Sequence, residues 1–229
     1  MSRVIIMVEG HTESAIVDHI IAPHLQTLAV CISPRLIGKP GHKGGTRRKF
    51  EAVLRELKAL LKQEPGTTIT TFFDYYGLPG DWPGVAESKG RPFLAIPGIV
   101  ETAIARAVTA EFTDSFNPER FIPYVQMYEL EALLFSSPRA MAEVFEQPRL
   151  QAEFEKIVEE CRGCEQINDD PDQAPSKRIE ALYPPYKKGK SELAHAWRIL
   201  NRIGLDRVRA ACPHFSDWLT RLERLGQPI

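Results

Sequence analysis

The sequence predicts an α/β fold: a mostly parallel sheet with helices on both faces, followed by an all-helical C-terminal extension. Three observations predict it. Residues 3–8 form a short, apolar, β-branched run, as is typical of a strand buried in a parallel sheet. Strand-like and helix-like segments alternate as far as residue 127. From residue 138 onward, every periodic segment has helical spacing.

The first strand, residues 3–8, is followed at once by Glu9 and Gly10. Residues 14–25 then have helical periodicity, with Thr12 expected to cap the helix and Gly10 expected to allow the tight turn before it. Glu9 is therefore expected at the carboxyl end of a parallel strand. In open α/β sheets, this edge is where ligands bind.

The rest of the α/β region continues the alternation. Further strands are predicted at residues 30–37, 68–73 and 120–127, and helices at 47–63 and 99–112. Residues 38–45, "GKPGHKGG", predict a flexible basic loop, and the glycine- and proline-rich residues 77–98 predict a long loop of a functional or mobile kind.

The C-terminal extension consists of helical patterns alone, at residues 138–145, 150–161, 176–182, 191–203 and 205–225. We therefore expect an α/β domain at residues 1–136 and a helical extension at 137–229 that packs on it.

Composition indicates a soluble globular protein. The chain has 229 residues, 43% hydrophobic and 26% charged, with a formal net charge of -1. No apolar stretch approaches the roughly 20 residues that a membrane span needs. A strand begins near the first residue, so no signal peptide and a cytoplasmic location are expected.

Acidic residues follow several predicted strands: Glu9 the first, Asp74 the third, Glu129 and Glu131 the fourth. If the strands are parallel, these acids meet at one edge of the sheet, where like charges repel unless a cation joins them. Oxygen ligands suit Mg²⁺ or Mn²⁺. Glu13 is either a further ligand or an acid that favours the helix dipole. Of Glu129 and Glu131, one is expected to face the site and the other solvent.

Two basic segments are candidates for binding phosphate groups. The first is glycine-rich and contains Lys43, Arg47 and Arg48. The second contains Lys177 and Arg178 in "APSKRI", where a helix N-terminus could hold a phosphate. The alternative for the second segment is a capped helix with solvated bases.

Cysteine usage points to no special chemistry. Cys161 and Cys164 form a lone CxxC without a second pair at zinc spacing, so ordinary thiols are favoured over a metal or redox site. Cys31 and Cys212 are expected to be core or free thiols.

Five segments together resemble a known group of proteins: "VEGHTE", "FFDYYGLPGDWPG", "RFIPYVQMYELEALLFS", "INDDPDQAPSKRI" and "CPHFSDWL". Residues 1–135 resemble the Rossmann-like Toprim fold of type IA topoisomerases, primases, small ribonucleases and the OLD nucleases of phage defence. Nearly the whole chain resembles a Toprim-like family of unknown function that is often encoded beside ATPases and includes an abortive-infection protein.

The resemblance implies roles for particular residues. Glu9 matches the Toprim glutamate, a metal ligand or general base, and Asp74 matches the first aspartate of a D-x-D motif. Tyr76 stands where the second aspartate is expected. Glu131 resembles a glutamate of RloB-like Toprim proteins and would replace that aspartate. These matches imply a nuclease dependent on Mg²⁺ or Mn²⁺, with Glu9, Glu13, Asp74 and Glu131 as ligands, acting in phage defence with an ABC- or SMC-type ATPase.

Two other function classes stay open. Tyr76 in place of an acid favours a non-catalytic Toprim-like module that binds nucleic acid or nucleotide as a partner of an ATPase. The chain has no P-loop motif of its own, so any ATP hydrolysis is expected to come from that partner. Asp74 after a strand is also where an aspartyl nucleophile of a phosphatase or phosphotransferase would lie. The sequence does not decide whether the substrate is DNA or RNA, or whether the protein forms a homo-oligomer.

Overall fold

The computed structural model describes residues 1–39, 42–43, 49–112, 116–167, 170, 173–189 and 192–227; in residues 39 and 42–43 it describes the backbone alone. The chain divides into two compact units. Unit 1 contains Met1–Val125 and Leu222–Ile229, and unit 2 contains Gln126–Arg221.

Unit 1 is built on a parallel sheet, as predicted. Its strands are β1 (Ser2–Val8), β2 (Val30–Leu36), β5 (Thr67–Asp74), β6 (Phe121–Ile122) and β7 (Val125–Gln126). The order is β2-β1-β5-β6, with β7 also pairing with β5, and the pairs β1–β2, β1–β5 and β5–β6 are parallel. Strands β1 and β5 carry the most deeply buried side chains, because helices cover both faces of the sheet.

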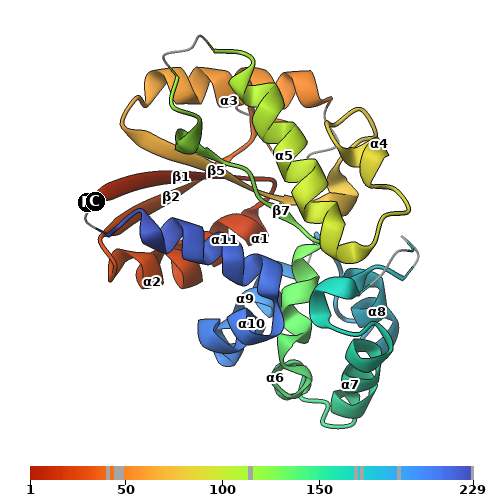
Figure 1. Ribbon diagram of the computed structural model, residues 1–229. Coiled ribbons are helices and arrows are strands. Elements are labelled where there is room, and N and C mark those ends of the chain that lie inside the picture. The colour runs from red at the N-terminus through yellow and green to blue at the C-terminus, as the bar shows by residue number, and fades with distance from the viewer. Residues whose placement is uncertain are drawn as a thin grey trace. The chain divides into compact units, whose positions relative to one another are not determined.

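The helices of unit 1 form two layers (Figure 1). On one face lie α3 (Phe50–Gln63) and α5 (Ile96–Thr109); on the other lie α1 (His11–Ile16), the π-helical turn η1 (Val17–Ile21) and α2 (Ala22–Gln26). Every third or fourth residue of α3 is buried, as its apolar spacing predicts. The α/β class predicted from the sequence is therefore confirmed.

The first helix begins earlier than predicted. It starts at His11 with Gly10 as N-cap, and no side chain caps it. Thr12, expected as the cap, is instead a buried residue within the first turn. Helical structure then continues through residue 26 without a break.

Other elements differ from prediction at prolines and glycines. Residues 120–127 form two short strands, β6 and β7, separated by Pro123, which has no N–H for the sheet. In the segment predicted as a flexible loop, β3 (Gly38–Lys39) and β4 (His42–Lys43) pair antiparallel. The long loop contains η2 (Tyr75–Gly77), α4 (Val85–Ser88) and η3 (Phe93–Ala95).

Unit 2 packs its helices around a buried 3₁₀ segment, η5 (Leu130–Ser136), in which every side chain is buried. Helices α6, α7, α8, α9 and α10 and the 3₁₀ turn η6 surround it; η5 contacts each of them. Their bounds are α6 (Pro138–Val144), α7 (Leu150–Glu160), η6 (Cys164–Gln166), α8 (Pro175–Leu182), α9 (Glu192–Ile203), α10 (Leu205–Ala211) and α11 (Pro213–Arg224). The helix predicted at 205–225 is divided at Cys212 because Pro213 starts a new one.

In the part of the chain that the structure describes, none of the helices has the length and apolar character needed to cross a membrane.

The end of the chain returns to unit 1. Ser2 Oγ donates to the Leu225 carbonyl, and His24 Nε2 lies 2.6 Å from Glu223 Oε1. A Cβ on Gly226 would lie 1.8 Å from the Leu28 carbonyl oxygen. Since this neighbour is backbone, it cannot move aside as a side chain would.

Replacement of Gly226 by alanine is therefore expected to lower the free energy of unfolding by about 1–3 kcal/mol, the usual cost of overpacking. Urea unfolding followed by circular dichroism measures it. Gly66→Ala is the control, because no atom lies within 4 Å of the added methyl group. Equal stability of the two variants would show that the packing of the chain end against Leu28 does not contribute to the free energy of unfolding.

Candidate functional site

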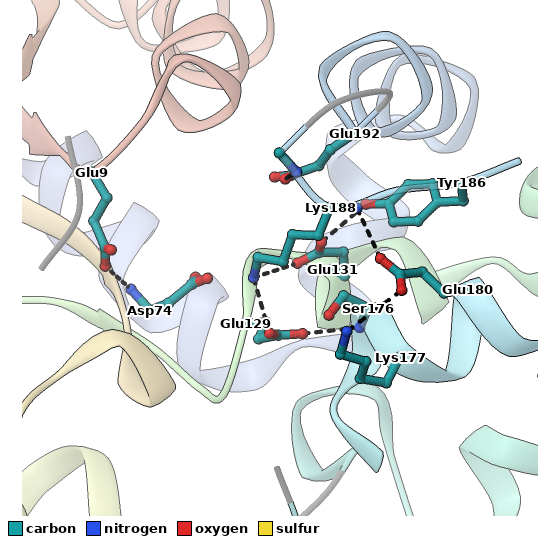
Figure 2. A network of polar contacts seen from close by, with 11 residues as sticks. Glu9, Asp74, Glu129, Glu131, Ser176, Lys177, Glu180, Tyr186, Lys188 and Glu192 are labelled. Atoms are coloured by element: carbon teal, nitrogen blue, oxygen red, sulfur yellow. Dashed lines mark hydrogen bonds and ion pairs between the residues drawn. The ribbon is translucent and has the colours of Figure 1, made fainter. Parts of the chain in front are cut away.

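Two of the predicted acids lie at the carboxyl edge of the parallel sheet. Glu9 directly follows β1, Asp74 is the last residue of β5, and these strands are neighbours. Glu9 Oε1 accepts a hydrogen bond of 2.6 Å from the backbone N–H of Asp74 (Figure 2). Asp74 is buried and Glu9 is half-buried. The sheet therefore brings the two residues together as the sequence predicts.

Glu13 lies beside the same turn. It is buried in the first turn of α1, and its Oε2 atom lies 2.8 Å from the place that a Cβ on Gly10 would occupy. Gly10 has an extended conformation, φ -141°, that any residue adopts. A Cβ at position 10 would therefore require the end of the flexible Glu13 side chain to shift. The backbone conformation does not itself require glycine, so the prediction that Gly10 is needed for the turn is wrong.

Whether this edge suits a metal depends on the ion. Among the residues with described positions, no three or more His, Cys, Asp or Glu side chains are grouped so that they could hold a metal ion. Mg²⁺, however, is usually held by one or two carboxylates, with waters and substrate phosphates completing its shell. Glu9 and Asp74 supply two carboxylates at this edge, with the Asp74 amide bonded to Glu9 Oε1, and Glu13 lies close to the same turn.

Tyr76, at the position where the resemblance implies a second aspartate, lies beside another tyrosine. Tyr76 is half-buried in η2, and its ring centroid lies 6.3 Å from that of Tyr75. The Tyr75 hydroxyl lies 2.8 Å from Ser88 Oγ, which anchors η2 to α4. A phenol therefore stands at this position, and it does not carry the negative charge that the aspartate implied by the resemblance would supply.

In unit 2, two buried glutamates lie on either side of one lysine (Figure 2). Lys188 Nζ lies 3.0 Å from Glu129 Oε1 and 3.3 Å from Glu131 Oε2. The Glu131 side chain is completely buried, and Glu129 is 8% exposed. The prediction that one of these two glutamates faces solvent is wrong. Residues 130–136 form a buried 3₁₀ helix rather than a strand with alternating faces, so both carboxylates point inward.

The segment that carries Lys188 is held at several points. The Tyr186 hydroxyl donates to Glu131 Oε1 at 3.0 Å, the Lys188 amide donates to Glu180 Oε1 at 3.0 Å, and the Gly189 amide donates to Glu192 Oε2 at 2.8 Å. Tyr186 is fully buried. The ammonium group of Lys188 is therefore fixed between the two glutamates.

Burial dominates the electrostatics of this cluster. It raises the pKa of Glu131 to about 8; Lys188 lowers that pKa, while Glu129 and Glu192 raise it. Burial, with the nearby Glu131 carboxylate, also raises the pKa of Tyr186. Near neutral pH, Glu131 therefore holds a proton that an exposed glutamate has lost.

The residues predicted to bind phosphate do not form an open phosphate site at the start of α8. At the start of α8, the Ser176 amide donates to Glu129 Oε2 at 2.9 Å, so an internal carboxylate already occupies this helix N-terminus. Lys177 is exposed and 3.5 Å from Glu180, and Arg178 donates to Gln173. Only the backbone of Lys43, in β4, is described. Arg47 and Arg48 lie outside the described residues.

The cysteines form no disulfide. Cys164 and Cys212 share a hydrogen bond, which lowers the pKa of Cys164 and raises that of Cys212. Cys212 is buried, whereas Cys31 is exposed. Cys164 therefore pairs with Cys212, 48 residues further along the chain, and not with Cys161 of the CxxC motif.

Sequence reasoning missed the importance of Tyr186, Lys188 and Glu192. The segment "YPPYKKG" has no periodicity that indicates burial, so nothing in the sequence distinguishes Lys188 from the other lysines near it. The one local sign of burial is weak: an aromatic residue, Tyr186, lies between two prolines and two lysines.

Comparison with family models gives one match, a family described as Domain of unknown function (DUF4276), over residues 8–223. Comparisons with curated proteins and with solved structures give no match. The matched range includes both Glu9 and the cluster around Lys188.

Proposed function

We propose that the protein, which belongs to the DUF4276 family, is a metal-dependent nuclease that hydrolyses phosphodiester bonds of nucleic acid. One observation carries the proposal. Glu9 and Asp74 meet at the carboxyl edge of neighbouring parallel strands, with Glu9 Oε1 on the Asp74 amide. That edge is where open α/β sheets bind ligands.

The proposed roles follow from the chemistry of the side chains. Glu9 and Asp74 would hold Mg²⁺ or Mn²⁺, with Glu13 as a further oxygen donor. Such an ion supplies a water of lowered pKa and stabilises charge on the phosphoryl group. A carboxylate at the edge would accept the proton of the attacking water. Glu131 remains a candidate catalytic residue and metal ligand through its resemblance to a glutamate of RloB-like Toprim proteins.

The Toprim relationship, the partner ATPase and the role in phage defence are parts of the same proposal. They are supported by the resemblance of the five sequence segments. Lys177, with its exposed ammonium group, and Arg178 are the described basic candidates for contact with the nucleic-acid backbone.

A nuclease assay tests the proposal. Plasmid, single-stranded DNA and total tRNA are incubated with Mg²⁺ and then Mn²⁺, with and without a candidate partner ATPase of the ABC or SMC type. Glu9→Gln and Asp74→Asn are expected to reduce the initial cleavage rate about 100-fold or more, since each removes a carboxylate charge. Glu87→Gln, an exposed acid on α4, is the control and should cleave at the native rate.

Glu9→Gln is informative because glutamine keeps an oxygen that can accept from the Asp74 amide. Loss of cleavage in this variant, with unchanged stability, points to the charge rather than to the fold. Absence of cleavage by the native protein under every condition would refute the nuclease proposal.

A second candidate is a non-catalytic Toprim-like module that binds nucleic acid or nucleotide as a partner of an ATPase. It is favoured by the bond from the Asp74 amide to Glu9, which gives Glu9 a structural role that requires no metal. In that case Glu9→Gln should behave as the native protein in cells, whereas Glu9→Ala should lose stability.

A further inference from the structure

A pocket of about 610 Å³ lies on unit 2 between α6 and α9. It is lined by Glu143, Val144, Trp197, Arg198, Asn201 and Arg202. The indole of Trp197 is 37% exposed, and Leu193, one helical turn earlier, is 42% exposed. Trp197 lines the pocket whereas Leu193 does not, and a concave site with an aromatic wall is a common form of binding site.

The surroundings of the pocket are positively charged. Arg139 Nε lies 2.8 Å from Glu143 Oε1, and Arg202 lies 2.9 Å from Glu143 Oε2. The hydrogen bonds from Arg139 and Arg202 lower the pKa of Glu143, which keeps this carboxylate ionised. Three guanidinium groups, those of Arg139, Arg198 and Arg202, therefore lie at or beside the pocket with the carboxylate of Glu143. The local charge is positive although the whole chain has a net charge of -1.

We propose that this pocket binds a base and the adjacent phosphate of single-stranded nucleic acid. The inference rests on the proposed nuclease function and specifies its substrate class. The indole of Trp197 would stack on the base, the Asn201 amide would bind the base edge, and Arg198 and Arg202 would contact phosphate. A duplex keeps its bases stacked on one another, so only an unpaired base can enter.

Binding is measured by fluorescence anisotropy with labelled oligonucleotides of about 12 nucleotides, as single-stranded DNA, single-stranded RNA and duplex DNA. EDTA is present to prevent cleavage. Trp197→Ala is expected to raise the Kd for single strands roughly tenfold, because an aromatic stacking partner is lost. Trp197→Phe keeps an aromatic face and should bind within about threefold of the native protein.

Two further variants separate stacking from general effects. Leu193→Ala truncates an equally exposed apolar side chain on the same helix outside the pocket, and should leave the Kd unchanged. Arg198→Gln should weaken binding and reduce the dependence of the Kd on salt by about one counterion. Thermal unfolding of each variant verifies that the fold is retained.

The two proposals fail in different ways. A native protein that binds single strands but is unaffected by Trp197→Ala overturns the pocket assignment and leaves the nuclease proposal intact. Equal or tighter binding of duplex also overturns it. If the pocket variants bind as expected and the native protein never cleaves, the nuclease proposal fails while the binding site stands. If the native protein binds no nucleic acid, the pocket assignment is wrong.

Discussion

Replacement of Lys188 by methionine is expected to lower the free energy of unfolding by about 2–4 kcal/mol at pH 8. The ammonium group lies 3.0 Å from Glu129 and 3.3 Å from Glu131, and both carboxyl groups are buried. Methionine keeps most of the side-chain volume but leaves these two acids without their shared cation. The side chain of Lys188 is 35% exposed, which places the expected loss toward the lower end for a buried ion pair.

The neighbouring lysine is a close control. Lys187 is exposed, so Lys187→Met makes the same chemical change one residue away and is expected to alter stability by no more than about 0.5 kcal/mol. Urea unfolding followed by circular dichroism, in EDTA, compares the two variants with the native protein. Similar losses for both would mean that Lys188 does not stabilise the cluster.

The second large effect is a dependence of stability on pH that Glu131→Gln is expected to weaken. Burial raises the pKa of Glu131 from its ordinary value of 4.5 to about 8 in the folded protein. Between these values the folded state keeps a proton that the unfolded state has released, so rising pH favours unfolding. The native protein should therefore lose roughly 2–5 kcal/mol of stability from this group between pH 5 and pH 8.

The measurement is urea unfolding of the native protein and Glu131→Gln at pH 5.5, 6.5, 7.5 and 8.5. Burial also raises the pKa of Glu165, so both proteins keep a slope of the same sign from that residue. The informative quantity is the difference in stability, which should shift in favour of the variant as pH rises. A difference that is constant with pH would mean that Glu131 titrates in the folded protein as it does in the unfolded chain.

The regular part of unit 1 could be predicted because its signals are local. The apolar run that ends at Val8 and the threonine- and aromatic-rich run that ends at Asp74 each specify a buried strand by their own composition. Parallel pairing then places the residues that follow, including Glu9, at a common edge. The close approach of the Glu13 carboxylate to position 10 could not be predicted, since it depends on how the Glu13 side chain is oriented.

The sequence by itself determined the α/β class, the order of the strands along the chain and the position of Glu9 and Asp74 at strand ends. Only the tertiary structure decided that Lys188 and Tyr186 bind Glu131, from which they are separated by 57 and 55 residues. The physical reason is the range of the interactions. Periodicity reports how neighbouring residues share a face, whereas a buried ion pair depends on how distant segments pack, and packing leaves no local pattern in the residues that form it.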